Sequence, residues 1–208
     1  MPQAERYNCI LLFGAPGVGK GTQGKLLGKI PGMYHLATGD IFRSLNRESD
    51  LGRKFHEYSS RGELVPDDLT IQVWLNHMQL LISQRVFSPS NDLLILDGMP
   101  RTLGQAKALD AYADVLRIVH LTTPNIDEMV ARMKRRALRE NRPDDANESV
   151  IRRRFEVYTQ ETRPVLGHYD RGLVAEVNGV GMPAEVLMHI LQVIVPIYNQ
   201  HCSNPLAG

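Results

Sequence analysis

Cysteine is scarce in this sequence. Only Cys9 and Cys202 occur among 208 residues, one within an apolar run and one near the end of the chain. Two cysteines are too few for a disulfide framework or for a zinc site built on cysteine pairs, and they fit a reducing compartment. We therefore expect a cytoplasmic protein that holds no zinc.

Long apolar runs and an excess of charge of one sign are lacking as well. No apolar run approaches the roughly 20 residues that a membrane-spanning helix needs. The amino terminus, MPQAERYNCILLFG, has no basic stretch followed by an apolar core, so it does not resemble a signal peptide. The 24 Lys and Arg residues nearly balance the 23 Asp and Glu residues, which gives a net charge of +1. This balance predicts that neither nucleic acids nor membranes are partners.

Apolar runs that alternate with helical stretches predict the fold. The hydrophobic fraction of 43% and the length of 208 residues suit one well-packed domain. Short apolar runs predict buried strands at Tyr7–Phe13, Asn91–Gly98, Leu116–Leu121 and Leu173–Gly179. Strands separated by helices indicate an α/β fold, with a parallel sheet covered on both faces and ligands at the carboxyl ends of its strands. After the third run, TTPNIDEM predicts a helix capped by Thr123 with Pro124 in its first position.

A glycine-rich segment follows the first predicted strand directly. GAPGVGK, from Gly14 to Lys20, fits the spacing G-x-x-x-x-G-K of a phosphate-binding loop. Its glycines let backbone N–H groups converge on an anion at a helix amino terminus, and the lysine reaches the terminal phosphates of a nucleotide. The usual Ser or Thr after the lysine is replaced by Gly21, with Thr22 next. We therefore expect Asp97, at the end of its strand, to hold Mg²⁺ through water.

Basic side chains concentrate in the stretch RMKRRALRENRPDD, from Arg132 to Asp145. Apolar residues at the spacing of one helix face accompany them, namely Ile126, Met129, Val130, Met133 and Ala137. Beside that face runs a stripe of Arg132, Arg136 and Arg139. Such a stripe can be a solvated helix face. However, these arginines follow a strand that ends near the phosphate loop, which favours a role in binding phosphates. A planar guanidinium can donate hydrogen bonds to two phosphate oxygens at once.

The next predicted helix, SVIRRRFEVYTQET, offers three more arginines. Its apolar face contains Ile151, Phe155, Tyr158 and Thr162. On a helical wheel Arg154 lies nearest to that face, and Arg153 lies almost opposite. We expect Arg154 to contact phosphate, and Arg153 stays as the alternative.

These segments together resemble one family. GAPGVGKGTQ is similar to the phosphate loop of adenylate kinases and related nucleoside monophosphate kinases. TGDIFR (38–43), GELVPDD (62–68), DGMPRTLGQ (97–105), RMKRR and RPDD resemble further motifs of that family. They occur in the family's order from residue 10 to about residue 181.

The resemblance implies a single P-loop kinase domain over residues 1–208. It implies the P-loop NTPase fold, with a five-stranded parallel sheet and two small insertions. One is a monophosphate-binding region at 37–66 and the other is a short lid at 132–145. The implied reaction is reversible transfer from MgATP to AMP, giving two ADP, by a monomer with no covalent intermediate.

The resemblance also implies the site residues. The catalytic cations are Lys20, Arg132, Arg136, Arg142 and Arg154. ATP would be bound by Gly17, Val18, Gly19, Lys20, Gly21, Thr22, Arg132, Arg136 and Gly181. AMP would be bound by Thr38, Arg43, Glu63, Leu64, Val65, Gly98, Met99, Pro100, Arg101, Gln105, Arg142 and Arg154. We expect Gln105 to read the adenine base, and Asp144 and Asp145 to hold the lid arginines, although these aspartates could instead cap the following helix.

Two alternatives stay open. A kinase of the same fold could act on UMP, CMP or another monophosphate, although Thr38 and Gln105 favour AMP. A P-loop ATPase could use the basic lid to hold RNA, which the near-zero net charge disfavours.

Overall fold

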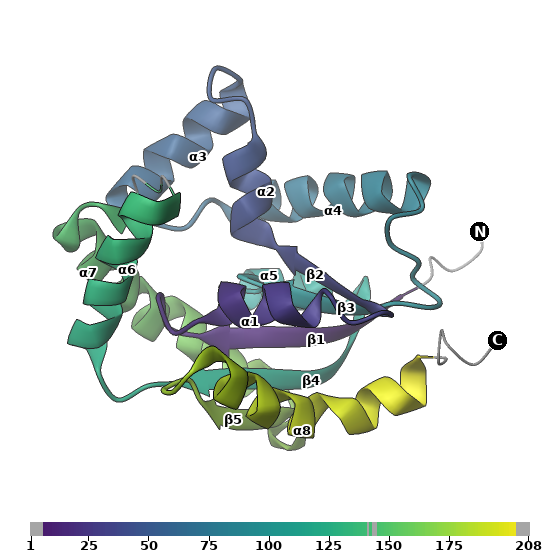
Figure 1. Ribbon diagram of the computed structural model, residues 1–208. Coiled ribbons are helices and arrows are strands. Elements are labelled where there is room, and N and C mark those ends of the chain that lie inside the picture. The colour runs from purple at the N-terminus through teal and green to yellow at the C-terminus, as the bar shows by residue number, and fades with distance from the viewer. Residues whose placement is uncertain (1–5, 141, 143–144, 203–208) are drawn as a thin grey trace.

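The computed structural model describes residues 6–140, 142 and 145–202 (Figure 1). Within these residues five strands form one parallel sheet in the order β2-β3-β1-β4-β5. The strands are β1 (Tyr7–Gly14), β2 (Met33–Ala37), β3 (Leu93–Asp97), β4 (Ala113–Thr122) and β5 (Val174–Asn178). Because all five are parallel, their carboxyl ends share one edge, which is where ligands of such sheets bind.

Helices connect the strands and cover both faces of the sheet (Figure 1). The α-helices are α1 (Lys20–Leu27), α2 (Thr38–Ser44), α3 (Asp50–Arg61), α4 (Asp67–Ser83), α5 (Leu103–Leu109), α6 (Ile126–Glu140), α7 (Glu148–Val157) and α8 (Pro183–His201). A π-helical turn, Tyr158–Thr162, and two 3-10 turns, Arg163–His168 and Arg171–Leu173, lead from α7 to β5. In the described part of the chain, no helix combines the length and hydropathy that a membrane span requires.

Two hydrophobic cores lie on opposite faces of the sheet. Successive side chains of β1 alternate between them, as side chains of a strand must. Cys9 and Leu11 pack with α4 and α5, where Trp74 is fully buried. Ile10 and Leu12 pack on the other face with α1, α6 and α8. The central strands are therefore apolar on both sides, which explains why the sequence shows them as continuous apolar runs.

The start of α6 differs from the sequence prediction. The backbone N–H of Glu128 donates to Asn125 Oδ1 at 3.0 Å, so Asn125 caps this helix and Thr123 does not. Pro124 lies before the helix, which begins at Ile126. The predicted cap at Thr123 was therefore wrong: the Thr123 hydroxyl accepts from the backbone N–H of Asn125, which precedes the helix, and the Asn125 carboxamide accepts from an amide of the first helical turn. Ile126 also departs from the apolar face and is 53% exposed.

The chain between β2 and α4 leaves the sheet as α2 and α3, and α3 projects beyond it (Figure 1). These helices fall within residues 37–66, and the second half of α6 falls within residues 132–145. The two segments approach each other above the carboxyl edge of the sheet. Arg142 Nη2 lies 3.5 Å from Asp40 Oδ1 of α2. At the end of α3, a Cβ added to Gly62 would stand 2.8 Å from the Val150 carbonyl oxygen of α7.

Candidate active site

The glycine-rich loop occupies the turn from β1 into α1. Gly17 and Gly19 have positive φ angles of 80° and 110°, which side chains rarely tolerate. Gly19 is the N-cap of α1 and supplies no side-chain cap, so amides of the first helical turn are open to an anion. Lys20 Nζ donates to the carbonyl oxygens of Gly14 at 2.6 Å and Ala15 at 3.1 Å, folded over the loop. The loop thus has the strand-to-helix setting that phosphate binding requires.

Lys20 lies in a strongly cationic environment. Burial of its ammonium lowers its pKa to about 8, and Asp97 partly offsets this effect. The positive charges of Arg101, Arg154 and Arg136 lower the pKa further. These arginines come from distant parts of the chain, so the fold brings them together around Lys20. A cluster of this kind is suited to a ligand with several negative charges.

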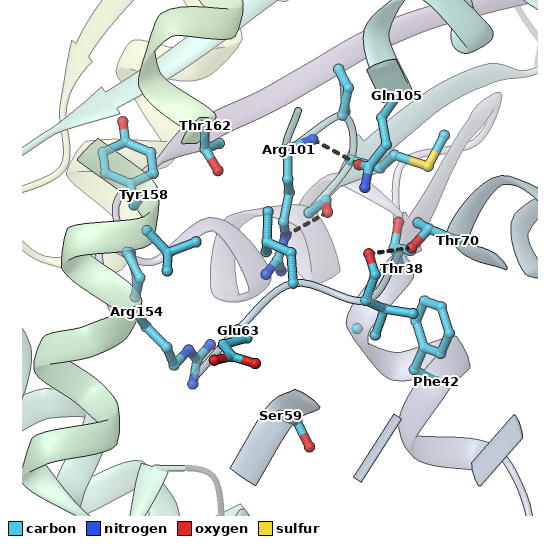
Figure 2. Close-up of a pocket in the computed structure, with 18 of the residues that line it drawn as sticks. Thr38, Phe42, Ser59, Glu63, Thr70, Arg101, Gln105, Arg154, Tyr158 and Thr162 are labelled. Atoms are coloured by element: carbon cyan, nitrogen blue, oxygen red, sulfur yellow. Dashed lines mark hydrogen bonds between the residues drawn. The ribbon is translucent and has the colours of Figure 1, made fainter. Parts of the chain in front are cut away.

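A cavity of about 140 Å³, open to solvent, extends from Lys20 toward α2 and α5. It is lined by most of the residues that the sequence assigns to AMP, namely Thr38, Arg43, Glu63, Leu64, Val65, Gly98, Met99, Pro100, Arg101, Gln105 and Arg154. Figure 2 shows Arg101 and Arg154 reaching in from different walls. The Thr38 hydroxyl is buried and has no hydrogen-bond partner within the described residues. A polar atom left unpaired beside a cavity is ready to receive a ligand.

Of the residues predicted to bind AMP, Arg142 alone does not line the cavity. It forms an ion pair with Glu140 at 2.8 Å and contacts Asp40 at 3.5 Å. Burial lowers its pKa, and the charges of Arg43 and Arg136 lower it further. Arg142 therefore stands next to the cationic cluster, between the α6 side and the α2 side of the site.

Two aspartates hold these arginines. Asp145 is fully buried, accepts from Arg136 Nε at 2.7 Å, and also pairs with Arg154. Asn147, rather than Asp145, caps α7. Asp144, which the sequence pairs with Asp145, lies outside the described residues. One buried carboxylate between two guanidinium groups limits their repulsion and fixes their positions.

On the α2 side of the site, Asp40 forms ion pairs with both Arg43 and Arg142, as Asp145 does with Arg136 and Arg154. Burial raises the pKa of Asp40, but the hydrogen bond and charge of Arg43 outweigh burial and hold the pKa below its usual value. We did not single out Asp40 from the sequence, although it belongs to the motif TGDIFR.

Two aromatic residues beside the cavity were also not predicted as site residues. The rings of Phe42 and Phe55 stack with their centroids 5.2 Å apart. In the sequence, nothing distinguishes these two phenylalanines from ordinary residues of a hydrophobic core.

The structure distinguishes the two candidate arginines of α7. Arg154 lines the cavity and pairs with Asp145, whereas Arg153 pairs with Glu156 on the exposed side of the helix. On α6, Arg132 pairs with Glu128 one turn earlier at 2.6 Å. Arg139 is exposed. Of the basic stripe on α6, Arg136 is therefore the member tied to the cavity, through Asp145.

The residues assigned to ATP, apart from Lys20, lie outside this cavity. Gly17, Val18, Gly19, Gly21 and Thr22 belong to the loop and the first turn of α1, and Arg132 and Arg136 belong to α6. Gly17 packs against α6, since a Cβ there would lie 3.0 Å from Met133 Cγ. Gly181 is exposed after β5, with a φ angle of 135°. The cavity thus corresponds to the predicted acceptor side of the site.

A magnesium ion fits the surroundings of Asp97. This residue ends β3 and is 8% exposed, and its charge acts on Lys20. A Cβ at Gly21 would lie 3.6 Å from Asp97 Oδ2, so α1 begins beside this carboxylate. Among the described residues, no group of three or more His, Cys, Asp or Glu could hold a metal alone. A single carboxylate near a phosphate loop suits Mg²⁺, which keeps several waters and binds substrate phosphates.

Comparison with known proteins shows which family the sequence resembles. The sequence model of the family described as Adenylate kinase matches residues 12–173. The adenylate kinase of Thermus thermophilus is 40% identical over 188 residues, which cover 87% of this chain and 94% of that protein. The adenylate kinase of Nocardia farcinica is 41% identical over 184 residues, covering 85% and 93%. The adenylate kinase of Kocuria rhizophila is 37% identical over 188 residues, covering 88% and 96%. With this similarity over most of its length, the chain belongs to the adenylate kinase family.

Proposed function

We propose that this protein transfers the γ-phosphoryl group of MgATP to AMP, reversibly, giving two ADP. One observation carries the proposal: Lys20 belongs to the phosphate loop and also lines the cavity formed by the predicted AMP residues. A donor phosphate on the loop and an acceptor phosphate in the cavity would therefore be neighbours. Direct transfer between two bound nucleotides requires this arrangement.

Catalysis in this proposal rests on positioning and positive charge. Phosphoryl transfer spreads negative charge over the equatorial oxygens, with little covalent chemistry left for the protein. Lys20, Arg132, Arg136, Arg142 and Arg154 would neutralise that charge. When bound with ATP, Mg²⁺ supplies further positive charge and aligns the phosphate oxygens, and Asp97 would hold it through water.

The acceptor phosphate would be gripped by Arg43 and Arg101, which line the cavity near α2 and α5. The base would lie deeper, against Thr38 and Gln105. This assignment is supported by their burial, since Thr38 is 3% and Gln105 2% exposed, and by the unpaired Thr38 hydroxyl. Gly181 would contribute backbone groups to the donor adenine.

The two segments that meet above the sheet would act as moving parts. In this proposal residues 37–66 close over the monophosphate and residues 132–145 close over the donor phosphates. Closure excludes water, which would otherwise accept the phosphoryl group. The ion pairs at Asp40 and Asp145 support a role for these carboxylates in assembling the arginines on closure. We propose that the protein does this as a cytoplasmic monomer.

The test is nucleoside diphosphate formation from MgATP with AMP, CMP, UMP or GMP as acceptor, each at the same concentration. Rapid ADP formation with AMP alone supports the proposal. A preference for CMP or UMP would keep the arginine mechanism but overturn the account of the base pocket. ATP hydrolysis without transfer to any acceptor, together with salt-sensitive RNA binding, would favour the P-loop ATPase alternative.

A further inference from the structure

We propose that Asp67 is a specificity-determining residue, which locks the orientation of the Gln105 amide so that the acceptor site takes adenine and rejects 6-oxopurines. Asp67 begins α4 and stands behind the cavity rather than in it. The inference rests on the proposed function, because it assumes that the acceptor base meets Gln105.

Four hydrogen bonds define the arrangement. Gln105 Nε2 donates to Asp67 Oδ1 at 2.9 Å, and Gln105 Oε1 accepts from the backbone N–H of Arg101 at 2.8 Å. Thr102 Oγ1 donates to Asp67 Oδ2 at 2.7 Å and accepts from the backbone N–H of Gln105 at 3.1 Å. Figure 2 shows the Gln105 amide in the cavity wall with its bond to Arg101. Both Asp67 oxygens are thus engaged with the segment that carries the amide.

The partners decide which end of the amide is nitrogen. An ionised carboxylate only accepts hydrogen bonds, so the group that faces Asp67 must be the NH₂ end of Gln105. A backbone N–H only donates, so the group that faces Arg101 must be the carbonyl oxygen. The two constraints agree, and each would be violated if the amide turned over. Gln105 is 2% exposed, which leaves little solvent to compensate a reversed amide.

The locked amide has one donor and one acceptor left. Nε2 carries a second hydrogen, and Oε1 has a second lone pair. Adenine presents the complementary pair on one edge, with N1 as acceptor and the 6-amino group as donor. Hypoxanthine and guanine present the reverse, with N1–H as donor and O6 as acceptor. Reading a 6-oxopurine would require the amide to flip, which places Oε1 against the Asp67 carboxylate.

Packing keeps Asp67 in this position. Gly104 precedes Gln105, and a Cβ on it would lie 2.4 Å from Asp67 Oδ2. The carboxylate therefore lies directly against the start of α5, without a side chain between them. Asp68, the next residue, lies in the same first turn of α4 but is exposed. It offers a matched control, since either aspartate contributes the same kind of charge to this helix terminus.

The experiment compares kcat/KM for AMP and IMP in the wild type, Asp67→Asn and Asp68→Asn. IMP differs from AMP only in the N1 and position-6 pattern that the amide would read. In Asp67→Asn the new amide can donate to a flipped Gln105 and still accept from Thr102, so only the Arg101 contact opposes the flip. We expect the AMP/IMP ratio to fall by about tenfold or more in Asp67→Asn. Asp68→Asn should keep both the ratio and the AMP activity of the wild type.

The ratio separates this role from a structural one. If Asp67 only stabilised the fold, its loss would lower activity with AMP and IMP alike, and a ratio within twofold of the wild type would overturn the inference. An equal fall of the ratio in Asp68→Asn would overturn it too, because the effect would then belong to the helix terminus. Should Asp67→Asn not fold, Asp67→Ser repeats the test, since its hydroxyl both donates and accepts and suits a helix start. A wild type that does not use AMP would refute the proposed function instead.

Discussion

Binding of MgATP should draw a proton onto Lys20. In the free protein burial and three nearby arginines lower the pKa of Lys20 to about 8, so at that pH half of the molecules carry an uncharged amine. A triphosphate beside the ammonium favours its charged form and raises the pKa again. The site should therefore take up a proton as the nucleotide binds, and this uptake depends on pH.

The size of the uptake follows from the two protonation states. If the bound pKa returns to the ordinary value of about 10.4, uptake is about 0.1 proton at pH 7, about 0.5 at pH 8 and about 0.9 at pH 9. Mg²⁺-bound ATP is already fully ionised at pH 8, so the nucleotide contributes little to this change. Affinity for MgATP should fall as pH rises from 8 to 10, because an increasing share of Lys20 must first be protonated.

Titration calorimetry in buffers of different ionisation enthalpy measures the proton count directly. Wild type and Lys20→Met are compared at pH 7, 8 and 9, and the variant should lose the pH-dependent uptake even where it still binds nucleotide. A wild-type uptake near zero at pH 9 would refute the argument, because Lys20 would then keep its charge in the free protein or bind no phosphate. Equal uptake in Lys20→Met would assign the proton to another group.

Three further results are expected, each from a named contact. Arg136→Ala should reduce kcat by about a hundredfold or more, while circular dichroism should still show a folded protein. Unchanged turnover would remove Arg136 from the mechanism. Arg154→Ala should lower kcat as strongly as Arg136→Ala does. Arg153→Ala, on the exposed face of α7, should change kcat less than about twofold. Equal losses of kcat in the Arg153 and Arg154 variants would contradict the assignment of Arg154 as the phosphate-contacting arginine. Asp145→Asn should lower the free energy of unfolding by about 3 kcal/mol in urea titrations, because Arg136 and Arg154 lose their buried anion. An unfolding free energy equal to that of the wild type would show that the ion pairs of Asp145 do not stabilise the fold.

The central strands and the phosphate loop could be predicted because their signals are local. A strand covered on both faces must be apolar throughout, and the glycines and lysine of the loop stand at fixed spacing. The edge strand β2, Met33–Ala37, was not among the strands we placed. Tyr34 and His35 are only partly buried in it, so it lacks a continuous apolar run. Strand bounds elsewhere differ by a few residues, as at β4, which begins at Ala113.

The positions of most acceptor-side residues could be predicted from the motifs, but their partners could not. Asp40 and Asp67 both stand at or near helix starts, where an aspartate is common for local reasons. Nothing in the local sequence shows that Asp40 meets Arg142, 102 positions away, or that Asp67 meets Gln105, 38 positions away. The first pairing arises where α2 approaches Arg142, which follows α6, and the second arises from the packing of α4 against α5. The helical wheel of α7 predicted that Arg154 faces the cavity. It could not predict that Arg154 and Arg136 both pair with Asp145, because that contact depends on how α6 and α7 pack together.

The most direct test of the central claim starts from ADP alone. The protein is mixed with Mg²⁺ and ADP, without ATP or AMP, and the nucleotides are separated and quantified over time. Reversible transfer between two bound nucleotides predicts that ATP and AMP appear together in equal amounts, with no inorganic phosphate. Release of phosphate without ATP, or no reaction at all, would contradict the claim that this site joins a donor phosphate to an acceptor phosphate.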